Sequence, residues 1–459
     1  MTAPRSLDEL RQRVAWAGSP LYLGAGVNGP AFAPPQQAML VLGPPRSGKT
    51  TSLVVPNVLL APGAVVSTST KPDVLAATYT ERNRLGRCWL FDPTGTTPAP
   101  PGVTQLRWSP VPACRDWEMA LRTTRAMTVA ARPSVYHGDS AHWTERAEAL
   151  LAPIMHAAAV SDSGIDQVAR WVHRQDLDTP LAVLALGGAE IAEDILTGIK
   201  ATDPRELSGI WSTAAGIMAA YRSGRARDAA SEPNFDPRSL RSTADTVYIC
   251  ASGQDQSLVA PLVVGLLEQI RAGSYEATTA AYRSGRWPGP PIALILDEAA
   301  NIAPLPDLPS IVSEGGSQGL ITLGCFQDLS QARARWGPAA DGFVTLFGAK
   351  VVLGGIRDLP TLNMVSKVAG EAEFPHNSVT RRPLPIGRRH TTITRSTRRQ
   401  PRLPVDVIGN LPPGQAILIN GPEPPRLLSL TPWFHSPTFQ EARRQRELPS
   451  RAAILGRSL

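Results

Sequence analysis

VLGPPRSGKTTSLVVPNVLL, residues 41–60, contains a short apolar run, a loop rich in Gly and Pro, a Lys-Thr pair, and then apolar residues at helical spacing. Gly43, Gly48, Lys49 and Thr50 fit the pattern G-x-x-x-x-G-K-[ST], with a strand expected before it and a helix after it. Glycines let backbone N–H groups curve around phosphate oxygens, and the N-terminus of the helix adds partial positive charge. The stretch therefore predicts a nucleotide-binding loop. The alternative is a Gly-rich turn with an exposed lysine.

Residues of the predicted loop have distinct expected roles. Lys49 is expected to reach the β- and γ-phosphates, and Thr50 to place its hydroxyl on Mg²⁺. The sequence thus predicts ATP and Mg²⁺ as cofactors. The predicted nucleotide contacts are Gly43, Pro44, Pro45, Arg46, Ser47, Gly48, Lys49, Thr50 and Thr51.

A second stretch, PIALILDEAANI, supplies the acids that such a site requires. Apolar residues run into Asp297, expected to hold Mg²⁺ through water, and Glu298, expected to polarise the attacking water. A small-molecule kinase needs no second carboxylate, so the pair favours an ATP-hydrolysing machine over a kinase. The next apolar run ends at Gln327, which we expect to sense the γ-phosphate. The alternative for Gln327 is a cap of the following helix.

Composition sets the broad class of the protein. The 459 residues are 42% hydrophobic and 19% charged, which is typical of a globular protein with a large core. The net charge of +7 makes an acidic polymer or a membrane surface a plausible partner. The four cysteines show no metal-binding spacing, so we expect buried free thiols. No apolar run reaches the roughly 18 residues that span a bilayer, and the N-terminus lacks a signal-peptide core, which predicts a cytoplasmic protein.

Alternating strand and helix patterns predict an α/β fold with a mostly parallel sheet. Several of the strand-like runs are apolar throughout, as expected for strands buried on both faces. Two helical patterns, at residues 257–273 and 361–370, follow the fourth and seventh runs. The strand-like runs are residues 38–43, 63–69, 87–92, 246–252, 291–297, 320–326 and 350–355.

Strand patterns largely disappear between residues 111 and 240. Apolar residues there recur at i, i+3, i+4 and i+7, with stops at Pro and Gly, which predicts an inserted all-α domain. The predicted organisation is a lead-in (1–37), the first part of the nucleotide-binding domain (38–110), the insert (111–240), the second part (241–430) and a C-terminal tail (431–459).

The segment 374–405 contains eight arginines and no acidic residue. Such a run can neutralise phosphates and so bind DNA without sequence preference. The alternative is a solvated, partly disordered basic loop; the phosphate loop elsewhere in the chain favours nucleic acid. Only Phe374 is aromatic, so backbone contact is expected rather than base stacking. The predicted DNA contacts are Arg381, Arg382, Arg388, Arg389, Arg395, Arg398 and Arg399.

From about Ala38 to Leu430 the chain resembles the type IV secretion coupling proteins, the TraG/TraD-type conjugative DNA-transfer ATPases. Beyond the two nucleotide motifs, the resemblance rests on the order of several stretches around the helical insert. They are STKPDV (69–74), LFDPTG (90–95), HWTERAEALL (142–151), DTVYICASGQDQSLVAPLV (245–263), SQGLITLGCFQDLSQ (317–331), LGGIRDLPTLNMVSKVAG (353–370) and LPVDVIGNLPPGQAILI (403–419).

The resemblance implies a RecA-like P-loop motor domain, an all-α domain, a hexameric ring and ATP-driven movement of DNA toward a secretion channel. It implies DNA, a relaxase or other secreted substrate bound through the all-α domain, and the channel or a membrane-anchored protein as partners. Carried over by position, Lys49, Glu298 and Gln327 are catalytic, and Thr50 and Asp297 hold the metal.

Three departures from the family pattern affect these expectations. The family begins with transmembrane helices and this chain shows none, so either a partner supplies the anchor, the chain is a fragment, or the protein works unanchored. We expect a partner or a missing anchor to bring it to the inner face of the membrane. The acidic residue expected before Lys71 is Ser69. The arginine that would reach a neighbouring subunit's ATP is Gly316, so Arg357, Arg333 or Arg335 must serve in its place. Arg357 is favoured because a strand-end loop can face a neighbour across a ring.

Two other functional classes remain open. One is a double-stranded DNA pump of segregation, packaging or defence, which the helical insert argues against. The other is a non-motor adaptor whose ATP site only fixes a conformation. The intact Asp297-Glu298 pair argues against the adaptor, because binding alone needs no second carboxylate.

Overall fold

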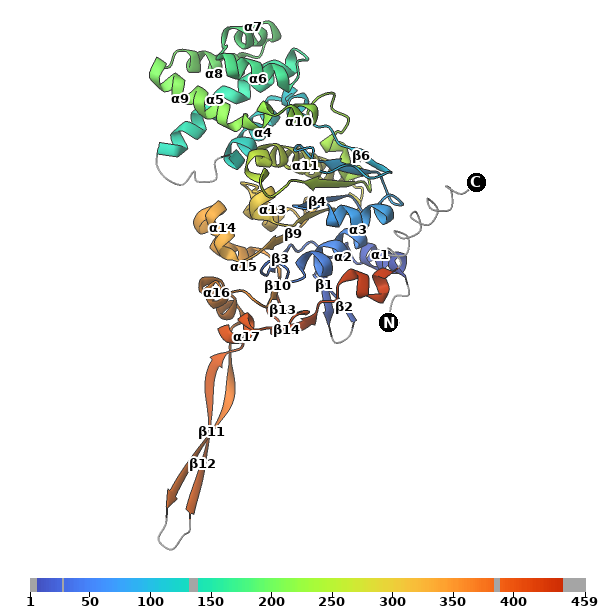
Figure 1. Cartoon of the computed structure of the whole chain (residues 1–459), viewed down its shortest axis with the longest axis vertical. Helices are drawn as coiled ribbons and strands as arrows, with labels where there is room; N and C mark the ends of the chain where they lie inside the picture. Colours follow the sequence, from blue (N-terminus) through green and yellow to red (C-terminus); the bar gives the residue numbers. More distant parts are fainter. Residues whose placement is uncertain (1–5, 27–28, 132–138, 384–388, 441–459) are drawn as a thin grey trace, which may run out of the picture.

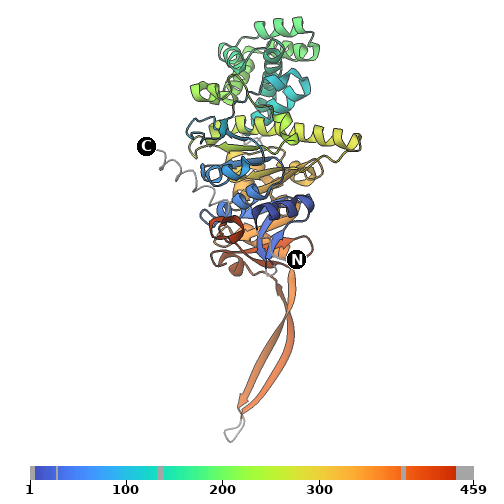
Figure 2. The same cartoon turned by 90° about the vertical axis from the view of Figure 1, so that its right-hand side faces the viewer.

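The computed structural model describes residues 6–26, 29–131, 139–383 and 389–440, without the side chains of 139–140, 377–378, 380–383 and 389–392. The described chain is elongated. A helical part lies at one end, a central sheet follows, and a two-stranded hairpin projects alone from the other end (Figures 1 and 2).

Twelve strands form one sheet in the described part of the chain, in the order β2-β1-β14-β13-β10-β3-β9-β8-β4-β7-β5-β6. Every pairing from β10 to β6 is parallel, whereas β13, β14, β1 and β2 add to the β10 side by antiparallel pairing. The bounds are β1 (Tyr22–Gly26), β2 (Gly29–Phe32), β3 (Met39–Leu42), β4 (Val65–Ser69), β5 (Cys88–Phe91), β6 (Val103–Gln105), β7 (Thr246–Cys250), β8 (Ile292–Leu296), β9 (Leu320–Phe326), β10 (Ala349–Leu353), β13 (Gln415–Asn420) and β14 (Arg426–Ser429).

All seven strands that the sequence predicts are present, and the α/β class with a mostly parallel sheet is confirmed. The sequence did not predict β1, β2, β6, β13 and β14. Of these, β2 and β6 are the edge strands of the sheet, and β6 has only three residues. β13 is an inner strand with an apolar centre, Ala416 to Ile419, which the sequence-based prediction missed. β1 and β2 belong to the segment expected as a lead-in, and they extend the sheet instead.

The sheet is buried on both faces, because its central strands alternate between two apolar clusters. Leu40 and Leu42 of β3 contribute to one cluster, and Met39 and Val41 to the other. On the first face lie α11 (Gln256–Arg283), α12 (Ala299–Ile302), α13 (Leu308–Glu314), α14 (Leu329–Trp336), α15 (Phe343–Leu346), α16 (Leu359–Ala369) and α17 (Val405–Gly409). On the second face lie α1 (Leu7–Trp16), α2 (Val55–Leu60), α3 (Asp73–Arg82) and the short turns η6 (Trp433–His435) and η7 (Pro437–Phe439), so the expected C-terminal tail packs on the sheet in its described part.

Between β6 and β7 the described chain is helical and contains no strand, as the sequence predicts. The helical block and the first face of the sheet share one apolar cluster, and α4 packs along α11 (Figure 1). The elements are η2 (Pro112–Arg115), α4 (Trp117–Ala131), α5 (Asp139–Val160), α6 (Ile165–Arg174), α7 (Asp178–Gly187), α8 (Glu190–Lys200), α9 (Pro204–Ile217), η3 (Ala219–Arg222), α10 (Gly224–Asp228) and η4 (Pro237–Ser242). The aromatic side chains Trp171, Trp211 and Tyr221 of this block are buried in that core.

The arginine-rich segment forms a hairpin, which corrects the alternative of a basic loop. β11 (Glu371–Pro383) and β12 (Arg389–Pro401) pair in register over their whole length, from Glu371↔Pro401 to Pro383↔Arg389. The β-branched residues of β12, four threonines and Ile393, give it strand propensity that the arginine count obscures. All four cysteines are buried and free, as expected. No helix in the described residues combines the length and the apolarity needed to cross a membrane.

Arg82 ties the amino ends of β4 and β7 together from inside the protein. Its fully buried guanidinium donates to the carbonyl oxygens of Ala61, Gly63 and Ala244 and to the Thr246 hydroxyl. Burial lowers its pKa to about 10. The group thus satisfies four acceptors at once in the interior.

We predict that Arg82→Met lowers the free energy of unfolding by about 3–5 kcal/mol, because several buried acceptors lose their donor. Urea denaturation followed by circular dichroism measures the change. Arg122→Met, at an exposed position of α4, is the matched control and should shift stability by less than about 0.5 kcal/mol. Equal effects of the two substitutions would contradict the structural role of Arg82.

Candidate nucleotide-binding site

The glycine-rich loop leaves the carboxyl end of β3 and enters a helix directly. The Gly43 N–H donates to the Phe326 carbonyl at the end of β9, over 3.1 Å, which fixes where the loop begins. The loop then runs into the π-helical turn η1 (Thr50–Val54), which continues as α2. The required context of strand, loop and helix is therefore present.

Two glycines of the loop are required by its geometry. Gly48 has φ +96°, a conformation that side chains rarely adopt. A Cβ at Gly43 would lie 2.8 Å from Ser47 Oγ and 3.0 Å from Leu353 Cβ. Arg46, although not a glycine, also has a positive φ of 62°. The backbone thus curls tightly, as a cradle for phosphate oxygens must.

Lys49 is buried, and its ammonium group donates to the carbonyl oxygens of Gly43 and Pro44, the latter over 3.0 Å. Within the same loop, Ser47 Oγ is buried and has no hydrogen-bond partner. Thr51 Oγ1 donates to the Gly48 carbonyl. A cation bound only to carbonyl oxygens and an unpaired hydroxyl are groups that a phosphate would satisfy. These residues therefore fit a nucleotide phosphate.

Thr50 and Asp297 meet although they are 247 residues apart in the sequence. The Thr50 hydroxyl donates to Asp297 Oδ2 over 2.7 Å, and the Thr68 hydroxyl holds the Asp297 carbonyl over 3.0 Å. Burial raises the pKa of Asp297 to about 6, and the hydrogen bond from Thr50 opposes that shift. A buried carboxylate beside a hydroxyl, without a direct ion pair, fits a site for a hard divalent cation.

Glu298 follows Asp297 in a left-handed backbone conformation, with φ 56° and ψ 46°. Its side chain is partly exposed, and Asn301 Nδ2 lies 3.4 Å from its Oε2. The turn directs Glu298 away from the path of the strand while Asp297 stays buried. A non-glycine residue in this conformation is strained, and such strain is typical of functional positions.

Gln327 lies next to the loop, because it directly follows the residue that holds Gly43. Its backbone N–H donates to Gln331 Oε1 over 3.0 Å. The cap of α14 is Asp328, which accepts from the Ser330 N–H. Capping therefore does not account for Gln327. Thr68 and Asn301, which contact Asp297 and Glu298, were not predicted from the sequence. The only sequence signal for them is their position beside the predicted motifs.

Two of the three departures from the family pattern, Gly316 and Ser69, have local explanations. At Gly316 a Cβ would lie 2.1 Å from the Gln36 carbonyl oxygen, so no side chain fits there. Ser69 donates to Asp73 Oδ1 over 3.2 Å. An acid of the 69–74 motif, Asp73, thus contacts the position where the family acid is expected. Burial is the largest cause of the raised pKa of Asp297, and the charge of Asp73 adds to it.

Three arginines are candidates for reaching a neighbouring subunit's ATP in place of an arginine at Gly316, and they differ in their surroundings. Arg333 is engaged by Asp341 over 2.8 Å and lies 3.8 Å from Asp358. Arg335 makes no ion pair in the described part of the chain, and burial lowers its pKa. Arg357 is exposed and donates to Asn410 Oδ1 over 3.3 Å. A Cβ on nearby Gly355 would touch Pro44, so Arg357 lies close to the loop of its own chain.

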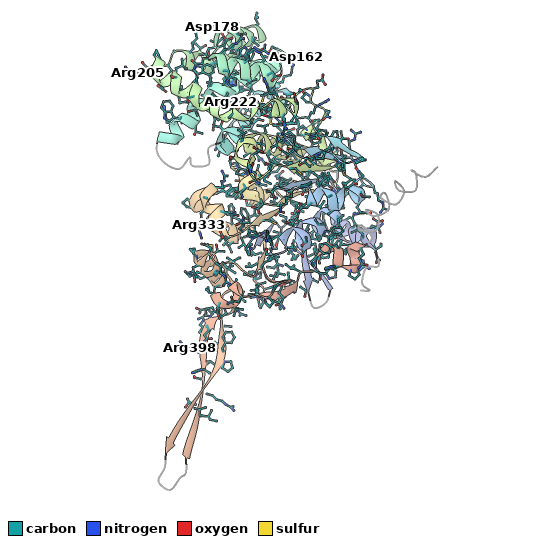
Figure 3. All side chains as sticks on the ribbon, viewed as in Figure 1. Asp162, Asp178, Arg205, Arg222, Arg333 and Arg398 are labelled. Carbon is teal, nitrogen blue, oxygen red and sulfur yellow. The ribbon has the colours of Figure 1, made fainter. Side chains whose placement is uncertain are left out.

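The predicted DNA-binding arginines belong to the projecting hairpin. Arg395, Arg398 and Arg399 of β12 are exposed, and Arg399 pairs with Glu371 over 2.9 Å. Figure 3 labels Arg398 on the hairpin. Arg388 and the side chains of Arg381, Arg382 and Arg389 lie outside the described residues. The hairpin is far from the nucleotide site, so the structure does not bring these two sets of residues together (Figure 1).

The strain at Glu298 makes a test that does not depend on activity. We predict that Glu298→Gly is more stable than Glu298→Ala by roughly 1 kcal/mol, because only glycine adopts this conformation without cost. The midpoints of thermal unfolding of the two variants measure the difference. Equal midpoints would show that the backbone of Glu298 is not strained.

No curated protein matches the sequence. Among solved structures, unbound TrwBdeltaN70, a bacterial conjugative coupling protein, superimposes with a TM-score of 0.64 at 18% identity over 93% of this chain and 91% of that one. The plasmid coupling protein TrwB in complex with the ATP analogue ADPNP gives 0.65 and 18%, over 93% and 92%. TrwB with ADP and Mg²⁺ gives 0.64 and 18%, over 92% and 91%.

These likenesses show that the fold is that of TrwB, a sheet with an inserted helical domain. The sequence profile described as "Type IV secretory system Conjugative DNA transfer" matches residues 5–455, nearly the full length. The order of motifs and the paired site of Thr50 and Asp297 agree with it. This chain therefore belongs to the type IV secretory system conjugative DNA-transfer family.

Proposed function

We propose that this chain is a Mg²⁺-dependent ATPase that drives DNA, or a protein–DNA substrate, toward a type IV secretion channel. The observation that carries the proposal is the hydrogen bond between Thr50 and Asp297 with Glu298 as the next residue. It joins the phosphate loop to a second strand end that carries two acids. Family membership and the TrwB complexes with ADPNP and with ADP and Mg²⁺ support the same ligands here.

Each residue has a task in this scheme. Lys49 would donate hydrogen bonds to phosphate oxygens instead of to the carbonyls of Gly43 and Pro44. Thr50 and Asp297 would hold Mg²⁺. The bound metal would neutralise charge that builds up on the phosphate. Glu298 would orient the attacking water and accept its proton. Gln327, next to Gly43, would report the state of the γ-phosphate to α14.

The proposed assembly is a hexameric ring associated with the inner face of the membrane through a partner or an anchor outside this chain. In such a ring an arginine of one subunit would act on the ATP of the next. Arg335 and Arg357 are the better candidates for that role, since neither forms an ion pair in the described part of the chain, whereas Arg333 is engaged by two aspartates. The helical domain would receive the relaxase or another secreted substrate.

We expect Glu298→Gln to keep nucleotide affinity and to lose at least about 100-fold in ATP turnover, because general base catalysis contributes about that much. Lys49→Ala should weaken nucleotide binding itself. Phosphate release and binding of a fluorescent ADP measure the two effects. The control is Glu314→Gln, at the exposed last residue of α13.

Unchanged turnover in Glu298→Gln would remove Glu298 as the base. No turnover in the wild-type protein, with or without DNA, would favour the non-motor adaptor. Both outcomes are visible in the same phosphate-release assay.

The hairpin arginines are expected to contact DNA phosphates. Changing Arg395, Arg398, Arg399 and Arg402 to Gln should reduce the slope of log affinity against log salt by about 0.7 to 0.9 per lost contact. Titrations of a labelled duplex and a labelled single strand between 50 and about 200 mM salt measure the slopes. The control changes four exposed arginines elsewhere, namely Arg122, Arg205, Arg283 and Arg286. An unchanged slope would make the hairpin a solvated arm.

A further inference from the structure

The hairpin of β11 and β12 is a long ribbon that the rest of the protein leaves uncovered (Figures 1 and 2). Its strands have 13 residues each and pair without a bulge along their whole length. Every residue from 393 to 400 is exposed. A two-stranded hairpin standing alone is at best marginally stable in water, because neither of its faces buries apolar surface. The hairpin therefore has the properties of an element that a partner completes.

The register divides the side chains of the hairpin between two faces, because alternate residues of a strand point to opposite sides. We name them the Arg399 face and the Arg398 face. The ion pair of Arg399 with Glu371 joins two residues of one face, which agrees with the register. Among the described side chains, the Arg399 face also carries Glu373, Val379, Ile393, Arg395 and Thr397. The Arg398 face also carries Phe374, His376, Thr394, Ser396 and Gln400.

The two faces differ in their chemistry. On the Arg399 face two glutamates offset two arginines, and Val379 and Ile393 lie directly opposite each other as an apolar pair. The Arg398 face has, in its described part, no acidic residue and no aliphatic residue larger than alanine. Its guanidinium, amide and hydroxyl groups are those that hydrogen-bond to base edges in the major groove of DNA. The Arg398 face is therefore the better match for a polar, negatively charged partner.

We propose that the hairpin lies in the major groove of duplex DNA, with its Arg398 face toward the bases. The major groove is about 12 Å wide and admits a two-stranded β-ribbon, whereas the minor groove is about half as wide. At about 3.3 Å per residue each strand spans roughly 40 Å, so the ribbon can follow the groove and keep the body of the protein clear of the duplex. Arg395 forms no ion pair among the described residues, and from the outer face it can turn to the phosphates at the rim of the groove.

A single strand is a poorer match for the hairpin. Proteins that bind single strands stack successive bases on aromatic rings inside a basic groove. The hairpin is a projecting ribbon, and Phe374 at its root is the one Phe, Tyr or Trp in the segment 374–405. The proposal rests on the proposed function in one respect, that the hairpin arginines contact DNA. It adds the form of the DNA, the groove and the face.

Thr394 and Thr397 provide a matched pair of variants, because both are exposed on β12 and they belong to opposite faces. Thr394→Glu and Thr397→Glu change the net charge and the strand propensity equally. We expect Thr394→Glu to weaken binding of a labelled DNA duplex at least about tenfold and Thr397→Glu less than about threefold, because only the first brings a like charge against the groove. Titrations use the full chain without ATP, so that hydrolysis does not enter. Circular dichroism verifies that both variants fold.

An RNA duplex of the same length and sequence is the matched ligand. It has the same number of phosphates, but its major groove is deep and narrow and excludes side chains. We expect the two threonine variants to bind the RNA duplex equally. In the wild-type chain the DNA duplex should slow hydrogen exchange in residues 371–376 and 393–401. The RNA duplex and oligothymidylate should not, and this measurement requires no variant.

Equal loss of DNA-duplex affinity in the two threonine variants would overturn the proposal, since the face would then not matter. Equal protection of the hairpin by DNA duplex, RNA duplex and oligothymidylate would also overturn it, and would leave the phosphate contact of the proposed function standing. Protection by vesicles of anionic lipid, with none by DNA, would remove both the groove and the DNA contact of the hairpin. Absence of ATP turnover with face-dependent duplex binding intact would count against the proposed motor alone.

Discussion

The parallel alignment of β3, β9 and β8 is the constraint on which the site depends. Parallel strands end at the same edge of a sheet, so the segments that leave them meet there. The phosphate loop follows β3, Gln327 follows β9 and Asp297 follows β8, with β9 lying between the other two. The hydrogen bond from Thr50 to Asp297 is the local result of this arrangement. The two residues are 247 positions apart in the sequence, so only the parallel strands bring them together.

Burial then gives these groups their chemistry. The parallel strands are covered on both faces, so Asp297 lies in a place where ionisation is costly, and its pKa rises to about 6 because of that burial. A carboxylate of this kind gains from a bound cation more than an exposed one does. Glu298 avoids the same burial through its left-handed turn, at the expense of backbone strain. Two adjacent acids thus acquire different surroundings, and hence different roles in the proposed mechanism.

The hairpin and the nucleotide site have different physical characters. The hairpin is an exposed ribbon with no core of its own, and its arginines are presented along β12. The nucleotide site lies at a sheet that apolar clusters cover on both faces. Backbone pairing holds the hairpin together, whereas burial positions the groups of the nucleotide site.

The sequence by itself determined the local chemistry. Glycine spacing identified the phosphate loop, apolar runs identified the seven buried strands, and helical periodicity identified the insert, because each of these signals lies within about 20 consecutive residues. The tertiary structure decided what depends on contacts between distant segments. It placed Asp73 in the 69–74 motif beside Ser69, gave Asp328 rather than Gln327 the cap of α14, and excluded any side chain at Gly316 through the Gln36 carbonyl. It also paired the arginine-rich segment as strands and brought Thr50 to Asp297. Thr50 and Asp297 are 247 positions apart and no periodicity links them; only the packing of the strands brings them together.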